Sequence, residues 1–257
     1  MRHTPRKRFG QHFLVDTSVI AEIIHIIHPV PGDRMIEIGP GLGALTKPLL
    51  NVLDELQVIE IDRDIVYYLS RTYAEKLVIH NIDALKFDFS ELGEGLRIIG
   101  NLPYNISTPL LFHLSRFSSL ITDMYFMLQL EVVERMVALP STPDYGRLSI
   151  MLQNRFEMEQ MLVVPAESFD PPPRVQSAIV CMRPKAEPTI PLEHERLFAE
   201  LVSAAFSQRR KTLRNTLRHY LTADDFERLE IDSGLRAENL SLAQYAAIVR
   251  QVYEDRQ

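Results

Sequence analysis

The residues best suited to chemistry are Asn101-Leu102-Pro103-Tyr104, which follow an apolar run ending at Gly100. Proline fixes its own φ angle and favours an extended conformation in the residue before it. We therefore expect this stretch to leave a buried strand and run along a sheet edge, presenting the Asn101 amide, the neighbouring carbonyl groups and the Tyr104 ring together. Oxygen acceptors beside a flat ring suit a planar heterocycle with an exocyclic amine, because the ring can stack while the oxygens bind the amine. The alternative is a strand end with an asparagine turn and a packed tyrosine.

A glycine-rich turn follows the strand predicted at residues 34–39 and precedes a predicted helix. Glycines allow the backbone to approach a ligand closely, and the amides at a helix start are free to donate. Gly39, Gly41 and Ala44 fit the pattern Gly-x-Gly-x-x-Ala, so an NAD-dependent oxidoreductase is one interpretation of this turn. A tight turn without a ligand is another.

Acidic residues end the next two predicted strands, at residues 56–62 and 76–80. Glu60 lies 21 residues beyond Gly39, where an acid can accept from both ribose hydroxyls, which disfavours NADP. Asp83 could accept from an adenine amine, or it could cap a turn. Ligands of open α/β sheets bind outside the carboxyl ends of the strands. We therefore expect these loops and Asn101 to converge on one crevice.

Length and composition indicate a folded protein with room for a large α/β domain and a smaller one: there are 257 residues, 46% of them hydrophobic. The single cysteine, Cys181, excludes a disulfide framework and a cysteine zinc site. The eight histidines show no metal-ligand spacing, so no metal is expected. Without an apolar signal segment or a membrane-length apolar stretch, we expect a monomeric cytoplasmic protein.

The net charge of −6 argues mildly against a nucleic-acid partner, but two regions without acidic residues argue for one. One region precedes Asp16, and the other covers residues 203–222. Basic islands of this kind can steer a polyanion to one face, although a solvated helix face is the alternative. Together with Arg147, the candidate phosphate contacts are Arg6, Lys7, Arg8, Arg209, Arg210, Lys211, Arg214 and Arg218.

The remaining pattern predicts a helix after Asp16, a strand at residues 97–100 and a second half that mixes strands and helices. In that half we expect helices at 108–117, 131–138 and 145–154, and strands at 123–129, 156–164 and 176–182. A proline-rich linker near residues 184–191 divides the chain into an α/β domain, 1–184, which carries the candidate chemistry, and a helical domain, 185–257, which carries one of the basic islands that suit a nucleic acid.

Three consecutive prolines stiffen a loop that begins at Phe169. Phe169 could be a second plate that stacks on a base, and Arg174 could contact a phosphate. A phenylalanine packed beneath a structural loop is the alternative for Phe169.

Taken together, these motifs resemble the ribosomal RNA adenine dimethyltransferases, in particular the bacterial small-subunit branch whose loss gives kasugamycin resistance. The stretch Asn101 to Tyr104 is similar to the catalytic motif of N6-adenine methyltransferases in general. The resemblance covers nearly the whole chain. It is carried by residues 7–14, 37–43, 58–62, 101–109, 169–175 and 208–215, with 236–239 and Tyr245.

The resemblance implies an α/β fold: a Rossmann-like sheet of seven mostly parallel strands that binds S-adenosylmethionine (SAM), with a small all-helical C-terminal domain. It implies that two adjacent adenosines in the 3′-terminal hairpin loop of 16S rRNA, within the small subunit or its precursor, each receive two methyl groups on N6. The family often has asparagine where this chain has His12. The implied SAM-binding residues are His12, Leu14, Gly39, Gly41, Glu60, Asp83 and Asn101.

The implied chemistry places the Asn101 amide oxygen and the Leu102 or Pro103 carbonyl around the adenine amine, with Tyr104 and Phe169 clamping the base. Two other interpretations stay open from sequence. One is a ribosome-assembly factor for which methylation is secondary, and the other is a DNA N6-adenine methyltransferase.

Overall fold

The computed structural model describes residues 12–73, 75–208 and 210–256. Its contacts divide the chain into two units: the first runs up to Val133 and includes 158–184, and the second comprises 134–157 and the residues from Lys185 on. The chain enters the helical unit at Glu134, returns to the first unit at Met158 and enters the helical unit again at Lys185. The boundary expected after residue 184 coincides with the second entry. The expected division did not place 134–157 with the C-terminal part. These residues belong there because Ala138, Tyr145 and Ile150 are buried in the core of the helical unit.

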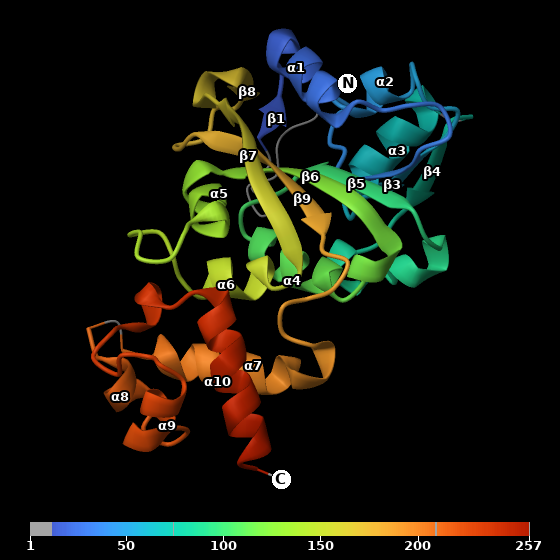
Figure 1. The fold of residues 1–257 in the computed structure, drawn as a ribbon. Coiled ribbons are helices and arrows are strands. Elements are labelled where there is room, and N and C mark those ends of the chain that lie inside the picture. Colours follow the sequence, from blue (N-terminus) through green and yellow to red (C-terminus); the bar gives the residue numbers. More distant parts are fainter. Residues whose placement is uncertain (1–11, 74, 209, 257) are drawn as a thin grey trace. The chain divides into compact units, whose positions relative to one another are not determined.

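The first unit is built on a seven-stranded sheet of order β4-β3-β2-β5-β6-β9-β7, as expected from the apolar runs (Figure 1). The β4, β3, β2, β5 and β6 strands are parallel, and β9 is antiparallel to β6. The strands are β2 (Arg34–Ile38), β3 (Leu56–Ile59), β4 (Leu77–His80), β5 (Leu96–Asn101), β6 (Ile121–Gln129), β7 (Phe156–Val164) and β9 (Ser177–Pro184).

Helices α1, α2 and α3 lie on one face of this sheet and α4 lies on the other (Figure 1). The Asp16 carboxylate caps α1 by accepting from the Ser18 and Val19 amides, and the helix ends at His28, whose φ of 49° is left-handed. The bounds are α1 (Thr17–Ile27), α2 (Thr46–Leu49), α3 (Arg63–Thr72) and α4 (Ser107–Ser115).

A second, two-stranded sheet joins the start of the described chain to the proline-rich segment, and it was not expected from the sequence. Strand β1 (Phe13–Leu14) pairs antiparallel with β8 (Phe169–Asp170), with Leu14 opposite Phe169. Elements of two residues are too short to show an alternation of apolar and polar side chains. This pairing sets His12 beside the carboxyl edge of the large sheet.

The second unit is helical. Leu213 and Leu217 are buried in its core with Phe198 and Tyr245. Helix α5 (Leu130–Val137) begins in the first unit and ends in the second. The others are α6 (Arg147–Gln153), α7 (Glu195–Ala205), α8 (Leu213–Thr216), α9 (Ala223–Arg228) and α10 (Leu242–Glu254).

Candidate active site

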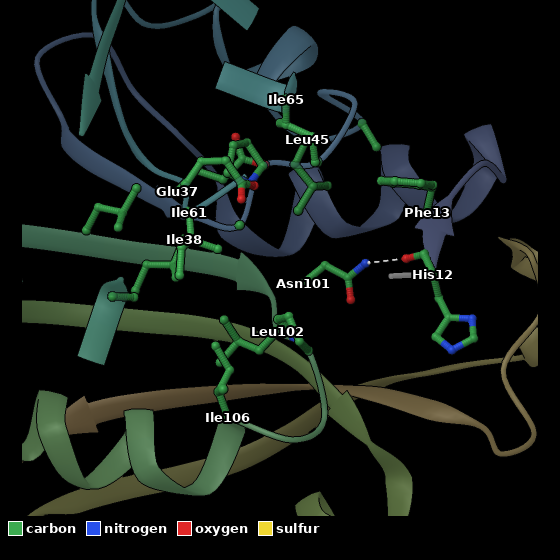
Figure 2. Close-up of a pocket in the computed structure, with 18 of the residues that line it drawn as sticks. His12, Phe13, Glu37, Ile38, Leu45, Ile61, Ile65, Asn101, Leu102 and Ile106 are labelled. Carbon is green, nitrogen blue, oxygen red and sulfur yellow. Dashed lines mark hydrogen bonds between the residues drawn. The ribbon is translucent and has the colours of Figure 1, made fainter. Parts of the chain in front are cut away.

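A cavity of about 330 Å³ lies at the carboxyl ends of β2, β3 and β5, where the strand order reverses (Figure 2). This is the position at which open α/β sheets bind ligands. Every cofactor candidate from the sequence lines it, as do the residues of the catalytic stretch. They are His12, Leu14, Gly39, Gly41, Glu60, Asp83, Asn101, Leu102, Pro103 and Tyr104.

The glycine-rich turn needs its glycines. Gly39 and Gly41 have φ angles of 67° and 54°, which favour residues without a Cβ atom. A Cβ atom on Gly41 would lie 3.2 Å from the Phe13 ring. The turn therefore brings bare backbone to the cavity wall while Phe13 packs against it.

Glu60 follows β3 directly and is 7% exposed. Its Oε1 accepts from the Asp62 amide at 2.8 Å, yet burial raises the pKa of this carboxyl to about 7. A buried carboxylate at a cavity wall gains from hydrogen-bond donors on a ligand, such as a pair of hydroxyl groups.

A second buried carboxyl group, Glu37, also lines the cavity, and the sequence analysis did not select it. Thr46 Oγ1 donates to Glu37 Oε2 at 2.5 Å. Burial first, and then the charge of Glu60, raise the pKa of Glu37 to about 7. Glu37 could have been selected from sequence because it is the single acidic residue inside the apolar strand Arg34–Ile38.

Asp83 caps a turn, as one of its two interpretations predicted, and it also lines the cavity. Its Oδ1 accepts from the Leu85 amide at 3.0 Å at the start of a short 3₁₀ turn, Ala84–Lys86. Asn81 Nδ2 donates to the Glu60 carbonyl at 2.8 Å, which ties this loop to the one after β3.

Asn101 ends β5, and its side-chain amide is oriented by the N-terminal segment. Its Nδ2 donates to the His12 carbonyl at 3.2 Å, and Figure 2 shows Oδ1 on the opposite side of the amide group. Within the described residues, no hydrogen bond to that oxygen is found. The Pro103 carbonyl already accepts from the Ile106 amide at 3.1 Å, so Leu102 supplies the better-placed of the two carbonyl candidates.

Tyr104 is half-buried beside the cavity. Its hydroxyl group is 3.0 Å from Ser177 Oγ, and burial raises its pKa. The His12 ring lies near-parallel to the Tyr104 ring, with the centroids 6.0 Å apart, while His12 Nδ1 donates to the Pro171 carbonyl at 2.7 Å. An aromatic surface therefore stands next to Asn101, as expected.

The second stacking candidate, Phe169, is buried. Its side chain is 4% exposed and packs in the core of the first unit with Leu14, Val164 and Ile179, so it does not line the cavity. The pairing of β8 with β1 turns it inward. The alternative interpretation, a phenylalanine packed beneath a structural loop, is the one that the structure has.

The candidate phosphate contacts are exposed wherever the structure describes them. Arg6, Lys7, Arg8 and Arg209 lie outside the described residues. Arg174 is exposed in the proline-rich segment of the first unit. The second unit presents Arg147, Arg210, Lys211, Arg214 and Arg218 to solvent.

Neither a metal-binding cluster nor a membrane-spanning helix is found in the part of the chain that the structure describes. No group of three or more histidine, cysteine, aspartate or glutamate side chains there could hold a metal ion. No helix among the same residues has the length and apolar character needed to cross a membrane.

The reversed strand order, the buried acids and the glycine-rich turn define the class of Rossmann-like methyltransferases. Comparison with known proteins agrees and goes further. The chain belongs to the ribosomal RNA adenine dimethylase family, whose model matches residues 2–254. This membership confirms the family and enzyme class expected from sequence and sets aside the NAD-dependent interpretation.

Individual relatives show the same family. The chain is 98% identical, over the whole length of both proteins, to "Ribosomal RNA small subunit methyltransferase A" of Nitrosomonas europaea. It resembles the crystal structure of a dimethyladenosine transferase from Plasmodium falciparum, with a TM-score of 0.79 and 26% identity over 95% of this chain and 98% of that one. The 23S rRNA methyltransferase ErmE shares the fold, with a TM-score of 0.71 and 22% identity over 94% of this chain and 99% of that one.

Proposed function

We propose that the protein transfers methyl groups from SAM to N6 of adenosines in the RNA of the small ribosomal subunit. Family membership and the names of its relatives support this reaction. The observation that carries the proposal is that Gly39, Gly41 and Glu60, which suit a nucleoside ligand, line the same cavity as Asn101 and Tyr104. The finer target is the pair of adjacent adenosines in the 3′-terminal hairpin loop of 16S rRNA.

The cavity wall fits SAM. Glu60 would accept from the ribose hydroxyls and Asp83 from the adenine amine, while Gly39 and Gly41 leave the backbone open to close approach. When bound, SAM supplies a methyl group made electrophilic by its positively charged sulfur. The side chains of Ile61 and Ile82, both partly exposed, line the same cavity and offer apolar contact.

The catalytic stretch then acts on the nucleophile. Asn101 Oδ1 and the Leu102 carbonyl accept from the two amine hydrogens, which favours a tetrahedral nitrogen with its lone pair directed at the methyl group. With SAM bound, the amine nitrogen would accept the methyl group in exchange for one of its protons, which would leave to solvent. After one transfer the amine carries a single hydrogen, which can be donated to only one of the two acceptors, and loss of that proton after a second transfer gives the dimethylated amine.

Tyr104 holds the base that reacts. An adenine inside a helical stack cannot reach the cavity, so the base must leave its stack. Stacking on an aromatic ring contributes about 1–3 kcal/mol per base, enough to offset part of the energy of unstacking.

The Asn101→Ala variant tests the proposal. Removal of the acceptor should lower the rate of methyl transfer to unmethylated small subunits by at least about 100-fold, the usual order for one preorganised polar contact. SAM affinity, measured by calorimetry, should stay within a few-fold of that of the unchanged protein.

The control is Asn51→Ala, an exposed asparagine outside the cavity lining, which should retain full activity. Mapping the methylated nucleotides in the product tests the hairpin target. Near-normal turnover by Asn101→Ala would remove Asn101 from the mechanism.

A further inference from the structure

The start of β9 lies at the same sheet edge as the catalytic stretch. Strand β6 runs between β5 and β9, with Met127 paired to Asn101 on one side and Gln129 paired to Ser177 on the other. Because β9 is antiparallel to β6, its first residue stands where β6 ends. The Leu102 amide donates to the Met127 carbonyl at 3.2 Å, which carries the catalytic stretch toward β9.

Tyr104 is held at both ends. Ser107 Oγ donates to the Tyr104 carbonyl at 3.0 Å, and Ser177 Oγ lies 3.0 Å from the phenol oxygen. Ser177 is 1% exposed and is not part of the cavity lining. Its hydroxyl group can therefore affect the cavity only through its hydrogen bond with Tyr104. Tyr104 is therefore fixed by its ring end as well as by its backbone.

We propose that Ser177 is a positioning residue, whose hydrogen bond fixes the plane of the Tyr104 ring on which the target base stacks. The inference rests on the proposed function, since it requires a base at Tyr104. A ring held before binding needs no ordering when the base arrives, and a base on a tilted ring presents its amine out of line with the methyl group. Loss of the bond should therefore lower kcat more than it raises KM.

A double-mutant cycle separates positioning from a simple packing role. Ser177→Ala and Tyr104→Phe each remove the same bond, while the second keeps the ring. Each should reduce kcat on unmethylated small subunits by about 3- to 10-fold, the range for one hydrogen bond. The double variant should be no slower than either single one, because there is only one bond to lose.

Ser168→Ala is the matched control. Ser168 is also 1% exposed in the first unit, and its hydroxyl group donates to Asp16 Oδ2 at 3.2 Å, outside the cavity lining. We expect it to lower the thermal unfolding midpoint about as much as Ser177→Ala does while leaving kcat unchanged. SAM affinity should be the same in all variants.

Three results would overturn the inference: wild-type kcat in Tyr104→Phe, a double variant whose defect is the product of the single defects, or a kcat loss in Ser168→Ala equal to that in Ser177→Ala. If Ser177→Ala fails to fold, Tyr104→Phe decides alone, because it leaves the strand unchanged. Failure here leaves the proposed function standing, whereas an active Asn101→Ala variant would undermine both.

Discussion

Two carboxyl groups that line the cavity, Glu37 and Glu60, should make ligand binding depend on pH. Both are buried, and both have a pKa raised to about 7 because burial disfavours the charged form. A ribose that donates two hydrogen bonds to Glu60 prefers the ionised carboxylate. Cofactor binding should therefore be linked to the loss of a proton.

SAM affinity should rise as the pH increases from 6 to 8, by up to about tenfold per unit below the pKa of Glu60. Calorimetric titration at several pH values measures this dependence. Glu60→Gln should bind SAM more weakly and lose most of the dependence, whereas Glu37→Gln should keep it, because burial is the main cause of the raised pKa of Glu60. An affinity for SAM that does not change with pH in the unchanged protein would contradict the assignment.

The raised pKa values of Glu37 and Glu60 also affect the free energy of unfolding, which should fall with rising pH while SAM affinity rises. Between the ordinary glutamate pKa of 4.5 and about 7, the folded protein binds more protons than the unfolded chain. The free energy of unfolding without cofactor should therefore fall as the pH rises through this window. Bound SAM, which favours the ionised form, should reduce the loss.

At the residue scale, the cavity lining could be predicted well from sequence because its motifs sit directly after apolar runs, so strand ends could be located. Phe169 is buried and lies outside the cavity lining, since its orientation depends on the pairing of β8 with β1, which no local pattern reveals, and its stacking role stays a prediction. Glu37 and Ser177 were missed for a related reason. Their roles come from Thr46 and Tyr104, partners that only the fold brings close.

At the scale of elements, the close approach of β2 and β5 positions Asn101. These strands pair in parallel at Ile36–Ile98 and Glu37–Ile99, and a Cβ atom on Gly100 would lie 2.6 Å from the Ile38 carbonyl oxygen. Gly100 therefore allows β5 to continue past the end of β2 without being pushed aside.

Gly100→Ala should destabilise the protein by about 1–3 kcal/mol, the usual effect of forcing an extra group into a packed site. Denaturant unfolding measures the change, and methyl transfer should fall as well because Asn101 follows directly. Gly146→Ala is the control, since a Cβ atom there meets nothing within 4 Å and its φ of −166° is ordinary extended backbone. Equal stability of the two variants would show that the strands can move apart freely.

All seven strands of the large sheet were predicted from the sequence. The central strands β2, β3, β5, β6 and β9 are largely buried and read as apolar runs, whereas the edge strands β4 and β7 are more exposed. The helical region was less regular than its pattern suggested. The domain at residues 185–257 was expected to be helical, yet the segment around Leu213 and Leu217 forms only a four-residue helix, α8. Both leucines are still buried, since packing rather than helix length decides their burial.

For the whole molecule, the net charge of −6 is compatible with a local concentration of positive charge, because residues 203–222 of the second unit contain basic residues and no acidic ones. Arg210, Lys211, Arg214 and Arg218 are exposed in one short segment. Phosphate contacts release counterions, so binding that depends on them weakens as salt rises.

Replacing Lys211 and Arg214 with glutamine should weaken binding to small subunits and reduce the slope of log affinity against log salt by about 1 for each phosphate that is no longer neutralised. Arg196→Gln is the control: Arg196 is 94% exposed in the same unit but pairs with Glu200 at 3.4 Å, and its replacement should leave the slope unchanged. Filter binding over a range of salt concentrations supplies both slopes. Equal slopes for all three proteins would place the RNA elsewhere.

The division of the chain into interleaved units has a practical consequence for anyone preparing fragments. Truncation after residue 184 looks like the natural way to isolate the catalytic part. The fragment would still contain residues 134–157, which pack in the second unit. Tyr145 and Ile150 would be left without the apolar neighbours that the C-terminal helices provide, and water would take their place. A soluble catalytic fragment would therefore need residues 134–157 replaced by a short polar linker.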